Sequence, residues 1–200
     1  MTPRWIAFAI VLLSEALVLG GLVVSIVRPE RRVWPAPRGA RSWQFWWSWG
    51  FLGVAVAGSL VLAWFDRGTF VFDHWVWKVA GVGIVAAAEF FNERAVRAVG
   101  RPASRGLGGP LVTRGPYGRT RNPQYLAQSA MVVGLVLVAD STLLAIAAVP
   151  GIVSLLLTPF AEEKWLEEHH GEAYRRYRER VPRFLGRRGG GGPESRSEEQ

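Results

Sequence analysis

Long apolar blocks separated by arginine-rich loops constrain the fold of this chain more than any other feature of its sequence. Five such blocks cover residues 5–27, 43–65, 75–91, 123–138 and 142–160. An α-helix rises about 1.5 Å per residue, so the longer blocks can each cross a hydrocarbon core of about 30 Å. The sequence therefore predicts an all-α, polytopic membrane protein with about five transmembrane helices.

The first block could instead be a cleavable signal peptide. It is longer than the apolar core of a signal peptide, and no Ala-x-Ala cleavage pattern comes after it. The block is succeeded by Arg28, Arg31 and Arg32, which together form a stop-transfer pattern. We therefore interpret the block as a membrane-spanning helix.

The net charge of +8 lies mainly in two interior loops and the C-terminal region. Loops 28–42 and 92–124 are rich in arginine, whereas Arg67 is the only basic residue before His74 in loop 66–74 and loop 139–141 has none. The two kinds of loop alternate, so the positive-inside rule places the N-terminus outside and the C-terminus in the cytosol. We expect an integral protein of a bacterial or archaeal cytoplasmic membrane, and no nucleic-acid partner.

Tryptophan is abundant, with 10 residues, whereas cysteine is absent. The absence of cysteine excludes a disulfide scaffold, a thiolate metal site and a cysteine nucleophile. Most of the tryptophan excess is interpreted as an aromatic belt rather than a ligand site, because six residues lie near predicted span ends. These are Trp5, Trp43, Trp46, Trp64, Trp75 and Trp165.

The last two apolar blocks are separated only by residues 139–141, so we expect a tight helical hairpin. A helix is then expected to leave the membrane and run into the cytosol over residues 159–177. We predict one membrane domain over residues 1–185, with its catalytic part at about residues 100–185. Residues 186–200 lack apolar side chains that could pack and are predicted to be a disordered tail.

Polar residues gather on the predicted cytosolic side of this hairpin. Before the fourth block, Asn122 is expected to be a helix N-cap and Pro123 the first helical residue. After the fifth block come Glu162 and Glu163, and a carboxylate at the membrane boundary should have a partner. The hairpin brings these glutamates near Arg114, Arg119, Arg121 and Asn122, together with Tyr117 and Tyr125, as a pocket suited to a zwitterionic cofactor.

The ordered run GPYGRTRNPQYL, a hairpin and EEKWLEEHHGEAYRRYRERVPRFL resembles the isoprenylcysteine carboxyl methyltransferase and phospholipid methyltransferase superfamily. The resemblance covers about residues 100–185. Two positions depart from the family pattern. Asn122 stands where histidine is common, and we expect no proton-transfer role there because an amide carries no titratable proton. Ala127 stands where glycine is usual.

The resemblance implies that S-adenosylmethionine binds between the fourth and fifth spans and the following helix. Arg121 and Asn122 are then candidates for its carboxylate, and Glu162 and Glu163 for its amino group and ribose. Its sulfonium would lie over Tyr125 or Tyr117. The full set of expected cofactor residues is Gly115, Pro116, Tyr117, Arg121, Asn122, Pro123, Tyr125, Glu162, Glu163, Tyr174 and Tyr177.

The resemblance further implies methyl transfer to a lipophilic small molecule or lipidated substrate that enters from the bilayer. The expected catalytic residues are Arg121, Glu163 and Arg183. Arg183 would orient a carboxylate acceptor, and Glu163 would take the proton from an amine or thiol acceptor. The residues leave open which atom accepts the methyl group and the oligomeric state.

Two other functions stay open at this point. One is an NADPH-dependent membrane reductase of the sterol-reductase kind, although such proteins usually have longer chains. The other is a non-catalytic scaffold whose arginines bind anionic membrane lipid.

A few remaining features bear on function. The string from Gly81 to Ala86 matches G-x-G-x-x-A, but no strand precedes it, so we interpret it as small residues for helix packing. The glycine-rich stretch 106–109 is interpreted as a flexible loop and a candidate lid over the pocket.

Adjacent His169 and His170 point to different faces of a helix, so we expect no metal site. Glu15, in the middle of the first block, is either functional or a neutral helix contact.

Overall fold

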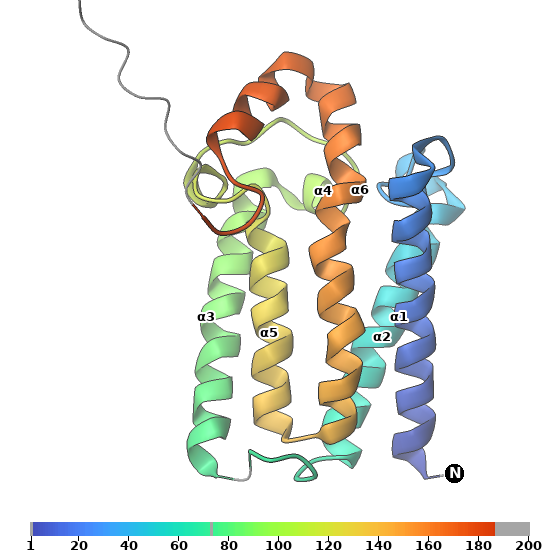
Figure 1. Cartoon of the computed structure of the whole chain (residues 1–200), viewed down its shortest axis with the longest axis vertical. Helices are drawn as coiled ribbons and strands as arrows, with labels where there is room; N and C mark the ends of the chain where they lie inside the picture. Colours follow the sequence, from blue (N-terminus) through green and yellow to red (C-terminus); the bar gives the residue numbers. More distant parts are fainter. Residues whose placement is uncertain (1, 73, 187–200) are drawn as a thin grey trace, which may run out of the picture.

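A bundle of long helices forms the molecule, and the computed structural model describes residues 2–72 and 74–186 of it (Figure 1). None of these residues lies in a β-strand, which confirms the predicted all-α fold. The helices are α1 (Pro3–Val27), α2 (Trp43–Phe65), α3 (Trp75–Val99), the short α4 (Arg101–Ser104), α5 (Pro123–Ala139) and α6 (Thr142–Arg180). Short 3₁₀ turns lie at Pro29–Arg31, Gly39–Arg41 and Gly115–Gly118.

Three helices in the described part of the chain are long and apolar enough to cross a membrane, namely α1, α2 and α6. Helix α5 is apolar but has only 17 residues, and α3 carries charged side chains in its second half. Helix α5 runs beside α6, and α3 runs along the other side of α5 (Figure 1). The count of five crossings therefore stays a prediction, as do the domain boundaries. The predicted tail lies outside the described residues except for Gly186.

The helices pack in a chain of neighbours, with α3 against α5, α5 against α6, α6 against α1 and α1 against α2. Helices α3 and α5 come especially close together. A β-carbon on Gly134 would lie 2.8 Å from Val85 Cγ2 and 2.9 Å from the carbonyl oxygen of Gly81. Glycine at both positions lets the two helix backbones come together, which agrees with the helix-packing interpretation of Gly81.

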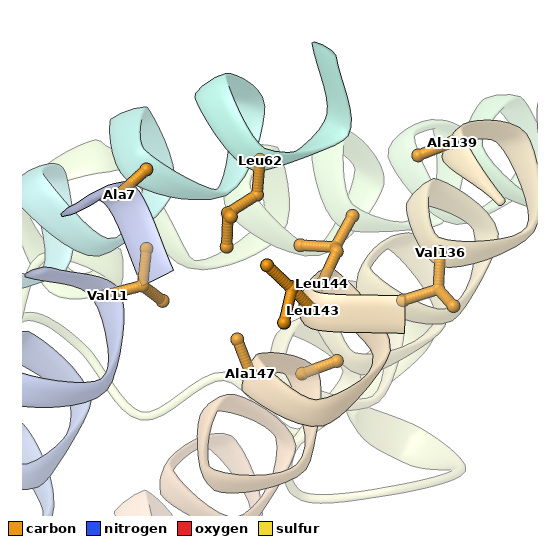
Figure 2. Packing of buried hydrophobic residues seen from close by; sticks show 9 residues of the cluster. Ala7, Val11, Leu62, Val136, Ala139, Leu143, Leu144 and Ala147 are labelled. Atoms are coloured by element: carbon orange, nitrogen blue, oxygen red, sulfur yellow. The ribbon is translucent and has the colours of Figure 1, made fainter. Parts of the chain in front are cut away.

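The tight hairpin between α5 and α6 is confirmed. Asp140 adopts the left-handed conformation (φ 51°), and Ser141 caps α6 by accepting from the Leu144 N–H at 3.1 Å. The buried Asp66 at the end of α2 accepts from the Ser141 hydroxyl at 2.8 Å. Figure 2 shows the apolar cluster beside this network, with Val11, Leu62 and Leu144 from three helices pointing toward one another.

The two ends of the bundle differ in composition. Loops 28–42 and 100–122 lie at one end with the last part of α6, whereas the N-terminus and the α5–α6 hairpin lie at the other (Figure 1). We call the end with loops 28–42 and 100–122 the arginine-rich end. This arrangement agrees with the predicted alternation of loops.

Five of the six expected belt tryptophans lie near helix ends and are exposed; these are Trp5, Trp43, Trp46, Trp64 and Trp75. Trp165 differs from the others. Its ring contacts that of His169 in a tilted arrangement, with ring centroids 4.2 Å apart, and it lines a polar cavity described below.

Helix α6 does not run straight into solvent after the apolar block. Its backbone breaks at Gly171 (φ 52°, ψ −129°), and the last turns fold back over the arginine-rich end (Figure 1). There Tyr174, Tyr177 and Val181 form a second buried cluster against Tyr117 and Leu166, among others. The bend therefore places the chain after residue 180 beside the start of α5, where Arg121 N–H donates to the carbonyl oxygen of Pro182 at 2.9 Å.

Candidate active site

Glu163 is at the centre of an ion-pair network on α6. Arg183 forms a bidentate ion pair with Glu163, donating from Nε at 2.7 Å and from Nη2 at 2.6 Å. Arg121 approaches from the other side, with its Nη1 2.8 Å from Oε1 of Glu163. These charge-assisted bonds are among the strongest in proteins, and they raise the pKa of Arg183 because its charged form is favoured.

Arg121 is nearly fully buried, with its side chain only 3% exposed. Besides Glu163, its Nη1 reaches the hydroxyl of Tyr174 at 3.3 Å. Its Nε is buried and has no hydrogen-bond partner in the described part of the chain. A buried N–H without a partner is costly, so this donor is well suited to an anionic group of a ligand.

Asn122 begins α5 at the expected N-cap position, and Pro123 is the first helical residue. The Asn122 side chain makes no capping hydrogen bond, which corrects the expected cap. Its amide instead donates to the carbonyl oxygen of Arg183 at 2.9 Å, and the Thr120 hydroxyl donates to the same oxygen at 3.0 Å. The polar residues before α5 therefore hold the chain segment that carries Arg183.

Glu162 has different partners from its neighbour Glu163. Its Oε1 accepts from the Tyr125 hydroxyl at 2.5 Å and from the Trp34 indole N–H at 2.8 Å. No arginine pairs with it among the described residues. The expectation that each glutamate has a partner is confirmed. The expected proximity to basic residues holds for Arg121, but neither carboxylate pairs with Arg114 or Arg119 in the described chain.

Three tyrosines close the site near the bend. The Tyr177 hydroxyl donates to the carbonyl oxygen of Tyr117 at 2.7 Å, and Gln124 donates to the Tyr117 hydroxyl at 2.7 Å. Burial raises the pKa of Tyr117 and of Tyr174 to about 12, and burial also raises the pKa of Tyr177. All three hydroxyls are therefore protonated near neutral pH and act as neutral hydrogen-bonding groups.

These residues surround a cavity of about 110 Å³ at the arginine-rich end. Eight of the eleven expected cofactor residues line it: Tyr117, Arg121, Asn122, Tyr125, Glu162, Glu163, Tyr174 and Tyr177. The other three do not. Gly115 and Pro116 belong to the turn before the cavity, and Pro123 starts α5. Arg183 contributes through its pair with Glu163.

A glycine-rich loop forms another wall of the cavity, through Gly106, Gly108 and Gly109. Gly106 has φ 71°, and a β-carbon there would lie 2.6 Å from Cη2 of Trp34. Only glycine allows both this backbone conformation and this contact. The loop that the sequence marks as a candidate lid therefore packs directly against Trp34.

A second, larger cavity of about 430 Å³ adjoins the first. It lies among α1, α2, α5 and α6 and is mostly apolar, with Trp34, Trp47 and Trp49 on its wall. Tyr125 and Gln124 line both cavities. The tryptophan excess therefore has two locations: exposed helix ends, as expected, and this cavity, which the sequence pattern does not indicate.

Sequence reasoning misses Gln124 and His170 as residues of the site, and it does not place Trp34 beside Glu162. The dipeptide Trp34-Pro35 by itself indicates only a gate or a rigid turn. Its indole contacts Glu162, which is 128 positions later in the chain. No local pattern encodes such a contact.

The arrangement suits a ligand that carries both charges. Arg121 and two glutamates line one cavity together with the aromatic side chains of Tyr117, Tyr125 and Tyr174, and Arg183 pairs with Glu163 beside it. Arginine can bind a carboxylate, and a carboxylate can bind an ammonium group or sugar hydroxyls. The fold and the site thus define a helical integral membrane protein with a polar ligand cavity at one end of its bundle.

The model of the phospholipid methyltransferase family matches residues 76–173. This match confirms the resemblance to the integral membrane methyltransferase superfamily that includes this family and the isoprenylcysteine carboxyl methyltransferases. The matched region runs from the start of α3 to just beyond the bend at Gly171, and it contains Arg121, Glu162 and Glu163. Searches of curated proteins and of solved structures returned no match.

The family match implies methyltransferase activity and lipid substrates. It also favours a methyltransferase over the reductase and the scaffold considered above.

Proposed function

We propose that the protein transfers a methyl group from S-adenosylmethionine to a lipophilic acceptor at the cytosolic face of the membrane. The observation that carries this proposal is the meeting of two partly buried carboxylates and two arginines around one cavity, with the Nε of Arg121 unpaired in the described chain. A zwitterionic cofactor would place its carboxylate at the free Nε of Arg121 and its hydrogen-bond donors at Glu162. The family match supports the methyltransferase class independently of the geometry.

The residues around the polar cavity fit this cofactor. Arg121 would bind its carboxylate through the free Nε, and Glu162 would accept hydrogen bonds from its ribose hydroxyls, which leave the Glu162 carboxylate without an ion pair. Tyr125 and Tyr117 offer aromatic faces to the sulfonium. When bound, S-adenosylmethionine supplies an electrophilic methyl group. Asn122 is assigned a positioning role, because its amide already donates to the Arg183 carbonyl.

The polar cavity of about 110 Å³ is small beside the roughly 300–1,000 Å³ of typical ligand sites. Entry of a whole cofactor therefore requires a wall to move. We assign this movement to the glycine loop at residues 106–109, in which three of the four residues lack side chains to anchor it and Gly108 faces Trp165.

Glu162 is better suited than Glu163 to accept a proton from an amine or thiol acceptor. Glu163 forms an ion pair with Arg121 and a bidentate pair with Arg183, so its negative charge is already balanced. Both hydrogen bonds to Glu162 within the described chain end on Oε1, which leaves Oε2 for the proton. Glu162 also bonds Tyr125, whose side chain lines both cavities. A carboxylate acceptor would need no base, and Arg183 would then orient it.

The orientation with the arginine-rich end in the cytosol belongs to this proposal. It is based on the positive-inside rule and brings the water-soluble cofactor to the polar cavity from the cytosol. The lipophilic acceptor reaches Tyr125 from the membrane side, through the apolar cavity.

Binding of labelled S-adenosylmethionine to the purified protein in detergent tests the proposal. We expect saturable binding at micromolar concentrations, loss of binding in Arg121→Ala, and unchanged binding in Arg119→Ala. Arg119 is the matched control, because it is an exposed arginine two residues away in the same loop. No binding to the wild-type protein, or binding of NADPH in its place, would refute the proposed cofactor.

A further inference from the structure

The larger cavity contains a buried carboxylate that the proposed chemistry does not use. Glu15 lies midway along α1, is 9% exposed, and lines the cavity. Ser154 on α6 donates to its Oε2 at 3.2 Å, and this is the only side-chain partner of Glu15 within the described residues. A carboxylate at membrane depth with a single weak partner is costly unless a ligand completes its contacts.

The second carboxylate oxygen of Glu15, Oε1, is left accessible by the absence of a side chain on Gly151. A β-carbon on Gly151 would lie 3.3 Å from Oε1, so any larger side chain there would crowd this oxygen. The rest of the cavity wall is mostly apolar, with Val18, Leu22 and Leu155 among its residues, and its other polar side chains are uncharged. Of the residues that the structure describes, no Lys, Arg or His lines this cavity. A positively charged donor that completes the site must therefore come from the occupant.

The depth of Glu15 below the polar cavity can be measured along α6. Ser154, which bonds Glu15, precedes Glu162 by eight residues on one helix, which corresponds to about 12 Å. An extended chain advances about 1.2 Å per atom, one third of its rise per residue. About ten chain atoms therefore separate a group beside Glu162 from a group beside Glu15.

We propose that the apolar cavity binds the tail of the methyl acceptor and that Glu15 selects tails with a hydrogen-bond donor at the far end. The donor is an amine or hydroxyl about ten chain atoms from the methyl-accepting end. Tyr125 marks the entrance from the polar cavity, Glu15 with Ser154 lies deeper, and the apolar wall continues beyond them through Leu144 and Ala147. The inference rests on the proposed function for the identity of the acceptor, but not for the binding site itself.

Tryptophan fluorescence tests the site without cofactor or turnover. The probes are decyl chains with bromine at one end and an amine, a hydroxyl or a methyl ether at the other. Bromine quenches tryptophan on contact, and Trp34, Trp47 and Trp49 line the cavity. We expect a saturable quenching phase whose affinity falls from amine to hydroxyl to ether, with about tenfold between the hydroxyl and the ether.

Substitutions of Glu15 separate its role from general hydrophobic binding. In Glu15→Leu the three probes should bind equally. In Glu15→Gln the preference for hydroxyl over ether should persist, whereas the preference for amine over hydroxyl should disappear. Glu93→Leu is the matched control, because it removes a carboxylate on α3 that does not line the cavity; it should behave as wild type.

Equal binding of the three probes to the wild-type protein would overturn the inference. Retention of the full preference in Glu15→Leu, or of the amine preference in Glu15→Gln, would overturn it as well. Failure of the proposed function has a different signature. If S-adenosylmethionine does not bind but the probes are discriminated through Glu15, the binding site stands and the methyltransferase assignment fails.

Discussion

Replacing Glu163 with glutamine should destabilise the fold of the arginine-rich end. Glu163 accepts two hydrogen bonds of 2.6 and 2.7 Å from Arg183 and forms an ion pair of 2.8 Å with Arg121, whose side chain is only 3% exposed. Removing one partner of a buried ion pair costs about 3–5 kcal/mol. The Arg183 side chain is 31% exposed, so solvent screening reduces the contribution of Arg183 to this cost. The glutamine oxygen also keeps one weaker hydrogen bond. We expect a loss of about 2–3 kcal/mol.

Thermal unfolding in detergent, followed by helical circular dichroism, measures this loss. For a chain of this size, each kcal/mol lowers the midpoint temperature by roughly 2–4 °C, so the expected decrease is about 4–12 °C. Glu172→Gln is the matched control. Glu172 is 59% exposed and pairs with Arg175 and Arg176 on the surface, so its loss should lower the midpoint by no more than about 2 °C.

The comparison between the two glutamine variants decides the result. If Glu163→Gln unfolds at the same temperature as Glu172→Gln, the ion-pair network does not hold the segment after the Gly171 bend against α5. The assignment of Glu163 as a structural counter-ion of Arg121 would then be wrong.

Three other perturbations have defined outcomes. Gly134→Val should lower stability by about 1–3 kcal/mol in the same thermal assay, because its side chain would enter the α3–α5 contact, whereas Gly83→Ala points into open space and should be nearly neutral. Tyr117 keeps its proton to about pH 12 when folded but to about pH 10 when unfolded, so stability should hold below pH 10 and fall between these values in pH titration. Trp34→Phe removes a 2.8 Å hydrogen bond to Glu162 and should weaken S-adenosylmethionine binding about fivefold in equilibrium dialysis; unchanged affinity would exclude Glu162 from the cofactor contacts.

The helices and the hairpin could be predicted from the sequence because they depend on local patterns. Long apolar blocks give long helices whatever their neighbours, and Pro123 marks the start of α5 through its fixed φ. The prediction that Glu162 and Glu163 need partners is based on the cost of a bare carboxylate at the membrane boundary. Each of these inferences uses only the residues within one segment and its distance to the next.

The partners themselves could not be predicted, because they depend on how distant segments fold back. Arg183 reaches Glu163 only because α6 bends at Gly171, and a glycine in a charged helix gives no indication of the direction of a bend. Trp34 reaches Glu162 from the first loop. The local pattern predicts that the Asn122 side chain caps its own helix, but the returning segment offers it the Arg183 carbonyl instead. In each case a tertiary hydrogen bond replaces or completes a local one.

Transfer of label from methyl-labelled S-adenosylmethionine into extracted membrane lipids tests the central claim most directly. The protein is reconstituted in vesicles made from lipids of its expression host, and the organic phase is counted. We expect label in the lipid fraction with the wild-type protein and with Arg119→Ala, and a loss of at least about tenfold with Arg121→Ala. Absence of lipid label from wild-type protein that binds S-adenosylmethionine, or equal labelling by Arg121→Ala, would contradict the proposed site.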